Sequence, residues 1–145
     1  MNTALEERSR RIGTLVVDDN PVFLEDLSRF LATEPAISVI GQARSGLEAT
    51  EQVARLGPDL VLIDLAMPGM NGLEATARIK ANPCPPRVII VTLHDGPVYS
   101  QAALVAKADG FLPKGDLRLA LMPMIAELFP RLPLPATRET DGETS

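Results

Sequence analysis

Short apolar runs alternate with helix-like stretches five times between residues 12 and 129, and this alternation limits the possible folds more than any other feature of the chain. Two of the runs, 60–63 and 88–91, are apolar at every position. A strand has this pattern when helices cover both faces of its sheet. Strict alternation of strands and helices favours a parallel sheet with crossover helices on both faces. The sequence therefore predicts an α/β fold with five strands and five helices.

Local signals predict where several helices begin and where one is disturbed. Asn20 and Pro21 supply an N-cap and a proline at the first helical position, directly after the first strand. Ser45 and Glu48 have the spacing of a capping box for the second helix. Pro123 falls inside the expected last helix, where it removes a backbone hydrogen bond. We expect that helix to bend or split.

The two ends of the chain differ in composition from the middle. Residues 1–11 are polar and charged, and residues 130–145 combine prolines with polar residues. Neither segment has enough apolar residues to bury a core, so we expect disordered tails on both sides of one domain, 12–129.

The overall composition excludes several classes of function. The net charge is −5 and the pI about 4.9, which argues against direct binding of nucleic acid. Cys84 is the only cysteine, so an intrachain disulfide cannot form. The sequence shows neither a secretory signal nor an apolar run of about 18 residues, the length needed to cross a membrane. We expect a cytoplasmic protein that does not enter a membrane.

Polar residues stand at the ends of four of the five strands. Asp18 and Asp19 follow the first strand, Asp64 follows the third, Thr92 ends the fourth, and Lys114 follows the fifth. The carboxyl ends of parallel strands lie at one edge of the sheet, where ligands bind in folds of this class. We therefore expect these five residues to form one site.

The residue types at this edge indicate phosphoryl transfer assisted by a cation. Three carboxylates held close together repel one another, and a divalent cation relieves the repulsion. Because all the ligands are hard oxygens, Mg²⁺ is favoured over zinc. Asp64 is the candidate nucleophile and would form an acyl phosphate. The cation and Lys114 would neutralise charge on the phosphoryl group, and the Thr92 hydroxyl would hydrogen-bond one of its oxygens.

Four segments resemble the receiver domain of two-component response regulators, of the CheY-like type. They are LVVDDNP (15–21), DLVLIDLAMPGMNGLEA (59–75), VIIVTLHD (88–95) and ADGFLPK (108–114). The resemblance covers residues 12–129. It implies a flavodoxin-like, doubly wound (βα)5 fold with a five-stranded parallel sheet in the order 2-1-3-4-5.

The resemblance also implies roles for individual acids. Asp64 matches the phosphoacceptor of the family. Asp19 matches a direct ligand of Mg²⁺, and Asp18 matches an acid that acts on the metal largely through water. The backbone carbonyl of Ala66 matches the third protein ligand, after Asp19 and Asp64.

Further positions match the switch of the family. Thr92 and Lys114 match the two residues that sense the phosphoryl group, and Phe111 matches an aromatic residue that turns inward in response. The alternative to this switching role is that Phe111 is an ordinary residue of the hydrophobic core. Lys107 departs from the pattern, because such receivers usually have glycine there.

The residues of these segments are most similar to those of NarL/FixJ-type receivers. A helix-turn-helix output domain usually follows such receivers, and we do not expect one here. We therefore expect a stand-alone receiver that takes its phosphoryl group from a histidine kinase. It would catalyse only its own phosphorylation and dephosphorylation. The fourth helix, fifth strand and fifth helix would bind a downstream protein, with a homodimer left open.

Other functions remain as alternatives. The first is a phosphorelay intermediate that passes the group to a histidine phosphotransfer protein. A degenerate receiver used only for interaction fits less well, because the site residues are intact. A flavin-binding protein is disfavoured because the sequence has no dedicated loop for the flavin phosphate. An aspartyl phosphatase is disfavoured because Ala66 stands where such enzymes carry a second acid.

Overall fold

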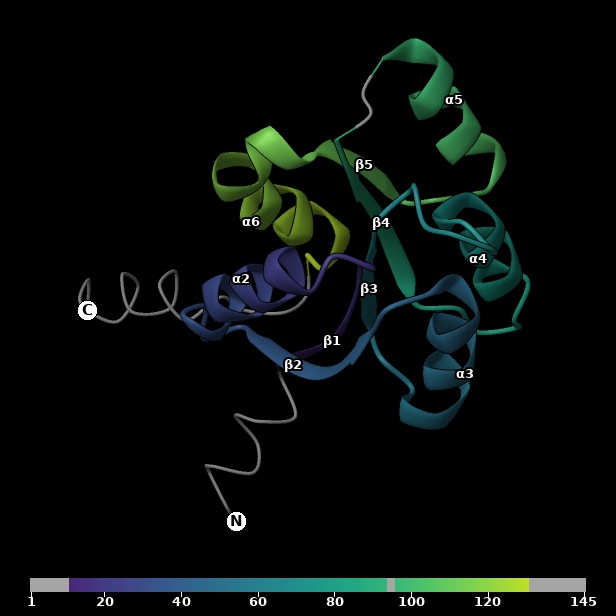
Figure 1. Ribbon diagram of the computed structural model, residues 1–145. Helices are drawn as coiled ribbons and strands as arrows, with labels where there is room; N and C mark the ends of the chain where they lie inside the picture. The colour runs from purple at the N-terminus through teal and green to yellow at the C-terminus, as the bar shows by residue number, and fades with distance from the viewer. Residues whose placement is uncertain (1–10, 94–95, 131–145) are drawn as a thin grey trace, which may run out of the picture.

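The computed structural model describes residues 11–93 and 96–130. Five parallel strands form one sheet in the order β2-β1-β3-β4-β5, which confirms the predicted class and order (Figure 1). The strands are β1 (Ile12–Val17), β2 (Ile37–Ala43), β3 (Leu60–Ile63), β4 (Arg87–Thr92) and β5 (Gly110–Pro113). The expected tails, 1–11 and 130–145, lie almost wholly outside the described residues.

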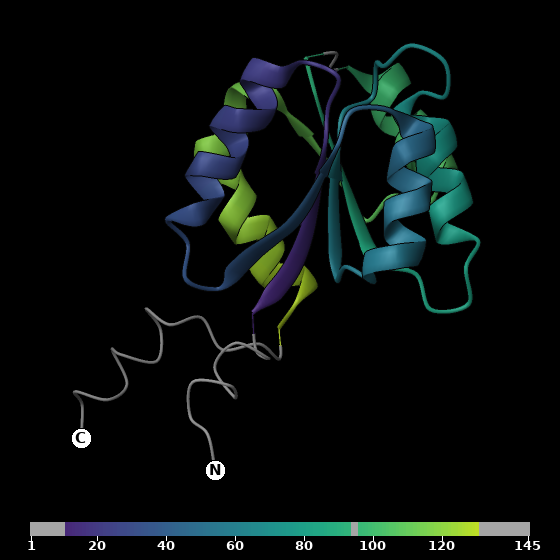
Figure 2. The ribbon, with the colours of Figure 1, turned by 60° about the horizontal axis from the view of Figure 1, so that its bottom comes forward.

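Helices cover both faces of the sheet. In Figures 1 and 2, α2 and α6 lie on one face, and α3, α4 and α5 lie on the other. The helices are α2 (Pro21–Ala32), α3 (Gly46–Leu56), α4 (Gly72–Lys80), α5 (Pro97–Val105) and α6 (Leu117–Leu128), with a 3-10 turn, η1 (Lys114–Asp116), before α6. None of the helices in the described ranges is both long enough and apolar enough to span a lipid bilayer.

The sheet separates two hydrophobic cores, because successive residues of a strand point to opposite faces. Leu60 and Leu62 of β3 pack in the core beneath α2 and α6, whereas Val61 and Ile63 pack in the core beneath α3 and α4. All four side chains are almost completely buried. This two-sided burial explains why the strand is apolar at every position.

The predicted helix signals are met to different degrees. Asn20 caps α2 through its side chain, as expected. The Ser45 side chain accepts a hydrogen bond from the backbone N–H of Glu48, but the Glu48 carboxylate accepts from Arg44 instead of closing the capping box. Pro123 was expected to bend or split the last helix; it does not split it, since α6 is one element from Leu117 to Leu128, and a bend stays a prediction.

Lys107 has an unusual backbone conformation at the end of α5. Its φ angle is 72°, and it is the one non-glycine residue with positive φ in the described part of the chain. Residues at this position after a helix adopt the left-handed conformation, which glycine tolerates without steric cost. The geometry explains why a glycine is usual here and shows that Lys107 holds a strained position.

Candidate functional site

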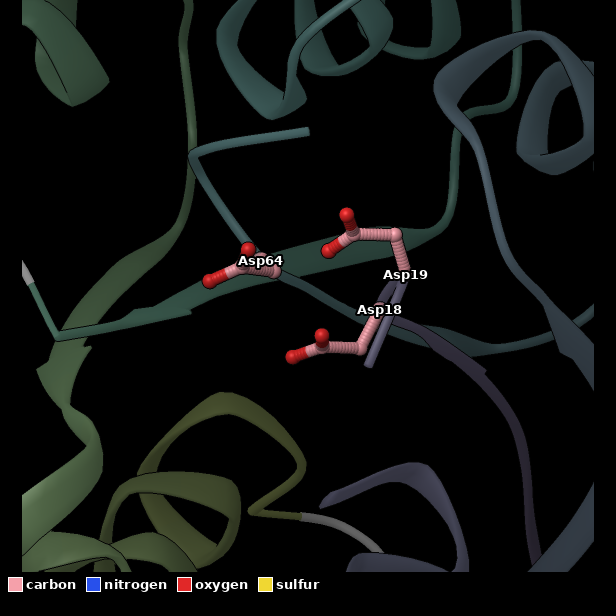
Figure 3. A group of neighbouring side chains, drawn as sticks. All are labelled: Asp18, Asp19 and Asp64. Atoms are coloured by element: carbon pink, nitrogen blue, oxygen red, sulfur yellow. The ribbon is translucent and has the colours of Figure 1, made fainter. Parts of the chain in front are cut away.

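Three carboxylates meet at the carboxyl edge of the sheet. Asp18 and Asp19 directly follow β1, and Asp64 directly follows the neighbouring strand, β3. Each offers an oxygen within 4.8 Å of the others (Figure 3). The structure thus brings together the three acids that the sequence predicts to converge.

Asp18 is the most deeply placed of the three acids, with 2% of its surface exposed. Its Oδ1 accepts a hydrogen bond of 2.8 Å from the backbone N–H of Asn20. The Asn20 side chain in turn accepts from the backbone N–H groups of Val22 and Phe23, which caps α2. The first turn of α2 is therefore linked directly to the carboxylate cluster.

Asp64 is fixed through its backbone from two directions. Its N–H donates to the carbonyl of Val17 at the end of β1, over 2.9 Å. The start of α4 lies against its carbonyl, since a Cβ added to Gly72 would come within 2.1 Å of the Asp64 oxygen. The N–H of Gly72 also donates to the carbonyl of Leu65. Only glycine fits at this close approach. The contact fixes the position of the Asp64 backbone, from which the carboxylate side chain extends.

Lys114 brings a positive charge into the cluster. Its Nζ lies 2.8 Å from Oδ2 of Asp18 and 3.5 Å from Oδ1 of Asp64. The shorter contact is an ion pair that is not aligned as a hydrogen bond, since Asp18 Oδ2 has no hydrogen-bond partner. The same Nζ lies 4.0 Å from the centroid of the Phe23 ring. In this state Lys114 is closer to Asp18 than to the expected nucleophile.

The surroundings of Asp64 favour its protonated form. Burial raises the pKa of Asp64 to about 6, and the nearby charge of Asp18 acts in the same direction. Lys114 opposes both effects through its charge and a hydrogen bond, and Asp19 adds a smaller upward contribution. A cation placed among these acids would lower the pKa again, because it favours the ionised carboxylate.

A shallow hollow of about 190 Å³ opens over the acids. The Ala66 residue, whose carbonyl is the expected third metal ligand, lines this hollow. The complete lining comprises Asp18, Asp19, Asn20, Asp64, Ala66, Leu93 and Lys114. The hollow is large enough for a hydrated cation or a phosphoryl group beside Asp64.

The two expected switch residues lie on neighbouring strands, β4 and β5, and are not among the residues that line this hollow. Thr92 is fully buried at the end of β4. Phe111 on β5 is half-buried, pairs in register with Ile90, and packs against the core beneath α3 and α4. It also lines a second, mainly apolar hollow of about 220 Å³ between β5 and α5. The core contact of Phe111 is present in this state, and its switching role stays a prediction.

The donor set fits Mg²⁺. It offers carboxylate oxygens just after the ends of two adjacent strands, with no sulfur or imidazole among the described residues that line the hollow. Asp18 Oδ2 is buried without a hydrogen bond, and the Lys114 ammonium supplies positive charge there. A hard divalent cation satisfies such oxygens and keeps part of its water shell.

Sequence reasoning missed three residues of this site. Asn20 and Leu93 line the hollow, and Phe23 contacts the ammonium. Asn20 and Leu93 directly follow Asp19 and Thr92 in the chain, so adjacency to the predicted residues was an available signal. Phe23 had a weaker signal, because the first turn of a helix after a site strand faces that site.

Comparison with known proteins identifies the family. The family model for the response regulator receiver domain matches residues 14–125. This chain belongs to that family. The match covers every site residue described above and all of the strands except the first two residues of β1, so the resemblance seen in the four sequence segments is confirmed.

Individual relatives extend beyond this chain. The probable transcriptional regulatory protein NarL of Mycobacterium tuberculosis is 32% identical over 117 residues, which cover 81% of this chain and 54% of that protein. The solved receiver domain of the putative NarL from this organism has a TM-score of 0.69 and 36% identity, covering 72% of this chain and 84% of that one. The chain thus spans about half the length of the curated relatives it matches first.

A third relative bears on the metal. The receiver domain of the histidine kinase CKI1 from Arabidopsis thaliana was solved in complex with Mg²⁺. It has a TM-score of 0.66 and 29% identity, over 81% of this chain and 91% of that one. Receiver domains bind Mg²⁺ at an acidic pocket, and this chain has a carboxylate cluster of that kind.

Proposed function

We propose that this receiver accepts a phosphoryl group on Asp64 from a histidine kinase, in a reaction that requires Mg²⁺. The observation that carries the proposal is the convergence of three carboxylates and one ammonium around a hollow at the sheet edge. Membership of the receiver family supports it independently. In this proposal the chain catalyses its own phosphorylation and dephosphorylation and no other reaction.

The chemistry assigns a role to each group. The ionised Asp64 attacks phosphorus with one carboxylate oxygen; the new P–O bond forms as the P–N bond to the kinase histidine breaks, and the electron pair stays on the imidazole nitrogen. Lys114 stabilises negative charge on the phosphoryl oxygens. Asp19, Asp64 and the Ala66 carbonyl would hold Mg²⁺, with Asp18 acting on it largely through water, and the cation would supply a positive charge against those oxygens.

The response is proposed to reach the surface through Thr92 and Phe111. The Thr92 hydroxyl would hydrogen-bond the phosphoryl group, and the half-buried Phe111 ring would turn further inward. Phe111 lines a hollow together with residues of α5, whose Leu104 and Val105 are largely exposed. Exposed apolar residues on α5, together with Leu119 of α6, give a downstream protein a surface to bind.

Mass measurement after incubation with acetyl phosphate and Mg²⁺ tests the proposal. The wild-type protein should gain one phosphoryl group, and Asp64→Asn should gain none, because an amide oxygen is too weak a nucleophile. Asp19→Asn should keep the fold and lose most of the labelling, and chelation of the metal should have the same effect. Equal labelling of wild type and Asp64→Asn would contradict the assignment.

Action without a fused output domain stays a prediction, because the chain spans only part of its longer relatives. The phosphorelay alternative makes a separate prediction. A relay intermediate would lose its label to a histidine phosphotransfer domain within minutes of mixing, and an effector would keep it.

A further inference from the structure

The ammonium of Lys114 has an aromatic neighbour as well as two carboxylates. Its Nζ lies 4.0 Å from the centroid of the Phe23 ring, and it is also close to the carboxylates of Asp18 and Asp64. The Lys114 side chain is only 11% exposed, so little water competes for the ammonium. A cation over the face of an aromatic ring is attracted by the negative charge density of that face.

Phe23 is itself held in place by the carboxylate cluster. The Asn20 side chain accepts a hydrogen bond of 3.2 Å from the backbone N–H of Phe23, and the Asn20 backbone N–H donates to Asp18. The contacts therefore run from Asp18 through Asn20 and Phe23 to Lys114, and from Lys114 back to Asp18. The half-buried Phe23 side chain also packs against the core beneath α2 and α6, which limits its movement.

We propose that Phe23 is a positioning residue, which keeps the Lys114 ammonium beside Asp64 for phosphoryl transfer. This inference rests on the proposed function. A lysine side chain has four rotatable bonds and a strongly hydrated head, so two carboxylates alone leave it several arrangements. A cation bound at Asp18 would weaken the Asp18–Lys114 ion pair, whereas the contact with Phe23 needs no carboxylate oxygen.

The α2 helix offers a matched control for this idea. Phe30 is also half-buried against the same core, and the guanidinium of Arg118 lies 5.0 Å from the centroid of its ring. Phe23→Leu and Phe30→Leu therefore remove the same ring, and a similar cation contact, from one helix. Only the Phe23 substitution removes a contact with Lys114.

The kinetic experiment measures the rate of phosphorylation by acetyl phosphate with Mg²⁺. Phe23→Leu should lower the rate about three- to tenfold, the range expected for losing one partly desolvated cation–π contact. Phe23→Tyr keeps an aromatic face and should stay within about twofold of wild type. Phe30→Leu should match wild type. In a Lys114→Ala background, Phe23→Leu should have no further effect, because the two residues act through one contact.

A spectroscopic experiment separates positioning from general loss of stability. In the metal-free protein, the ring of Phe23 should shift the NMR signals of the Lys114 side-chain protons upfield. Phe23→Leu should remove that shift, while Phe23→Tyr and Phe30→Leu should keep it. Thermal unfolding of Phe23→Leu and Phe30→Leu should show similar losses of stability.

The outcomes distinguish this inference from the proposed function. If the wild-type protein takes no phosphoryl group, the proposed function fails and the inference fails with it. If the wild type is labelled and Phe23→Leu reacts as fast as Phe30→Leu, only the inference is overturned. Unchanged Lys114 signals in Phe23→Leu would also overturn it.

Discussion

Helices α2 and α5 both lie against the sheet but are held very differently. α2 buries Leu24, Leu27 and Leu31, and its first turn is capped by two hydrogen bonds to the Asn20 side chain. α5 buries only Ala103 and begins at Pro97, after Gly96, which offers no side-chain cap. The helix that supports the acidic site is thus firmly packed, whereas the helix beside β5 has little to anchor it.

This difference indicates where we expect the proposed switch to change the shape of the molecule. Local opening costs least where few apolar side chains are buried, and elements that move in a switch are drawn from such regions. A phosphoryl-accepting site needs groups fixed to within a fraction of an ångström, which the α2 side provides. The proposed switch needs a second arrangement of nearly equal free energy, and we expect it at α5, where few side chains are buried.

The largest expected effect compares one leucine from each helix. Leu31→Ala should lower the free energy of unfolding by about 2–5 kcal/mol, because it leaves a cavity under a completely buried side chain. Leu104→Ala should change it by less than about 0.5 kcal/mol, since this side chain is mostly exposed. Urea unfolding followed by circular dichroism measures both. Similar losses in the two variants would show that α5 is packed as firmly as α2.

A smaller effect concerns the stability that the protein loses by holding the Asp64 carboxylate in the acidic site, which the well-packed helix α2 supports. Folded Asp64 has its pKa raised to about 6, so between about pH 4 and 6 the folded state binds more protons than the unfolded state. Stability therefore falls as the pH rises through this window. In metal-free buffer at pH 8, Asp64→Asn should be more stable than wild type by on the order of 2 kcal/mol.

The measurement is the unfolding free energy of both proteins between pH 4 and 8. Their difference should shrink towards zero near pH 4, where Asp64 is protonated in the folded protein. If the unfolding free energies of the two proteins changed in parallel with pH, the pKa of Asp64 would not be raised in the folded state.

The smallest expected effect returns to α5 and its strained end. Lys107→Gly should raise stability by about 0.5–1 kcal/mol, because glycine adopts the positive φ of this residue without a steric cost. Lys107→Ala retains a Cβ and should give no such gain. Thermal unfolding measures the stability, and slower amide exchange confined to α5 would show that the strain loosens this helix. A gain from Lys107→Ala equal to that from glycine would point to the lysine charge instead.

The sequence predicted the sheet and the acidic cluster for the same physical reason. Apolar runs such as Leu60–Ile63 show which strands are buried on both faces, and the polar residue after each run then lies at a known edge. Both predictions use only the order of residues along the chain. They therefore needed no information about side-chain geometry.

Features that depend on geometry between distant residues were not predictable in this way. The shorter contact of Lys114 with Asp18, rather than with Asp64, follows from side-chain rotamers and not from spacing. The ring of Phe23 appeared in the sequence only as one apolar residue on a helix face. Pro123 was expected to bend or split α6, but the helix is not split, and the buried Leu121 and Ile125 hold it to the core on either side of the proline.

The contact between Gly72 and Asp64 has a mechanical consequence. With no room for even a methyl group between the helix and the strand, α4 cannot shift toward the sheet without pushing the backbone of Asp64. The end of β3 and the first turn of α4 therefore behave as one rigid block. A redesign that lets α4 move independently must first lengthen the loop 65–71. The backbone of Asp64 would then lose this support, and its carboxylate would be held less precisely in the site.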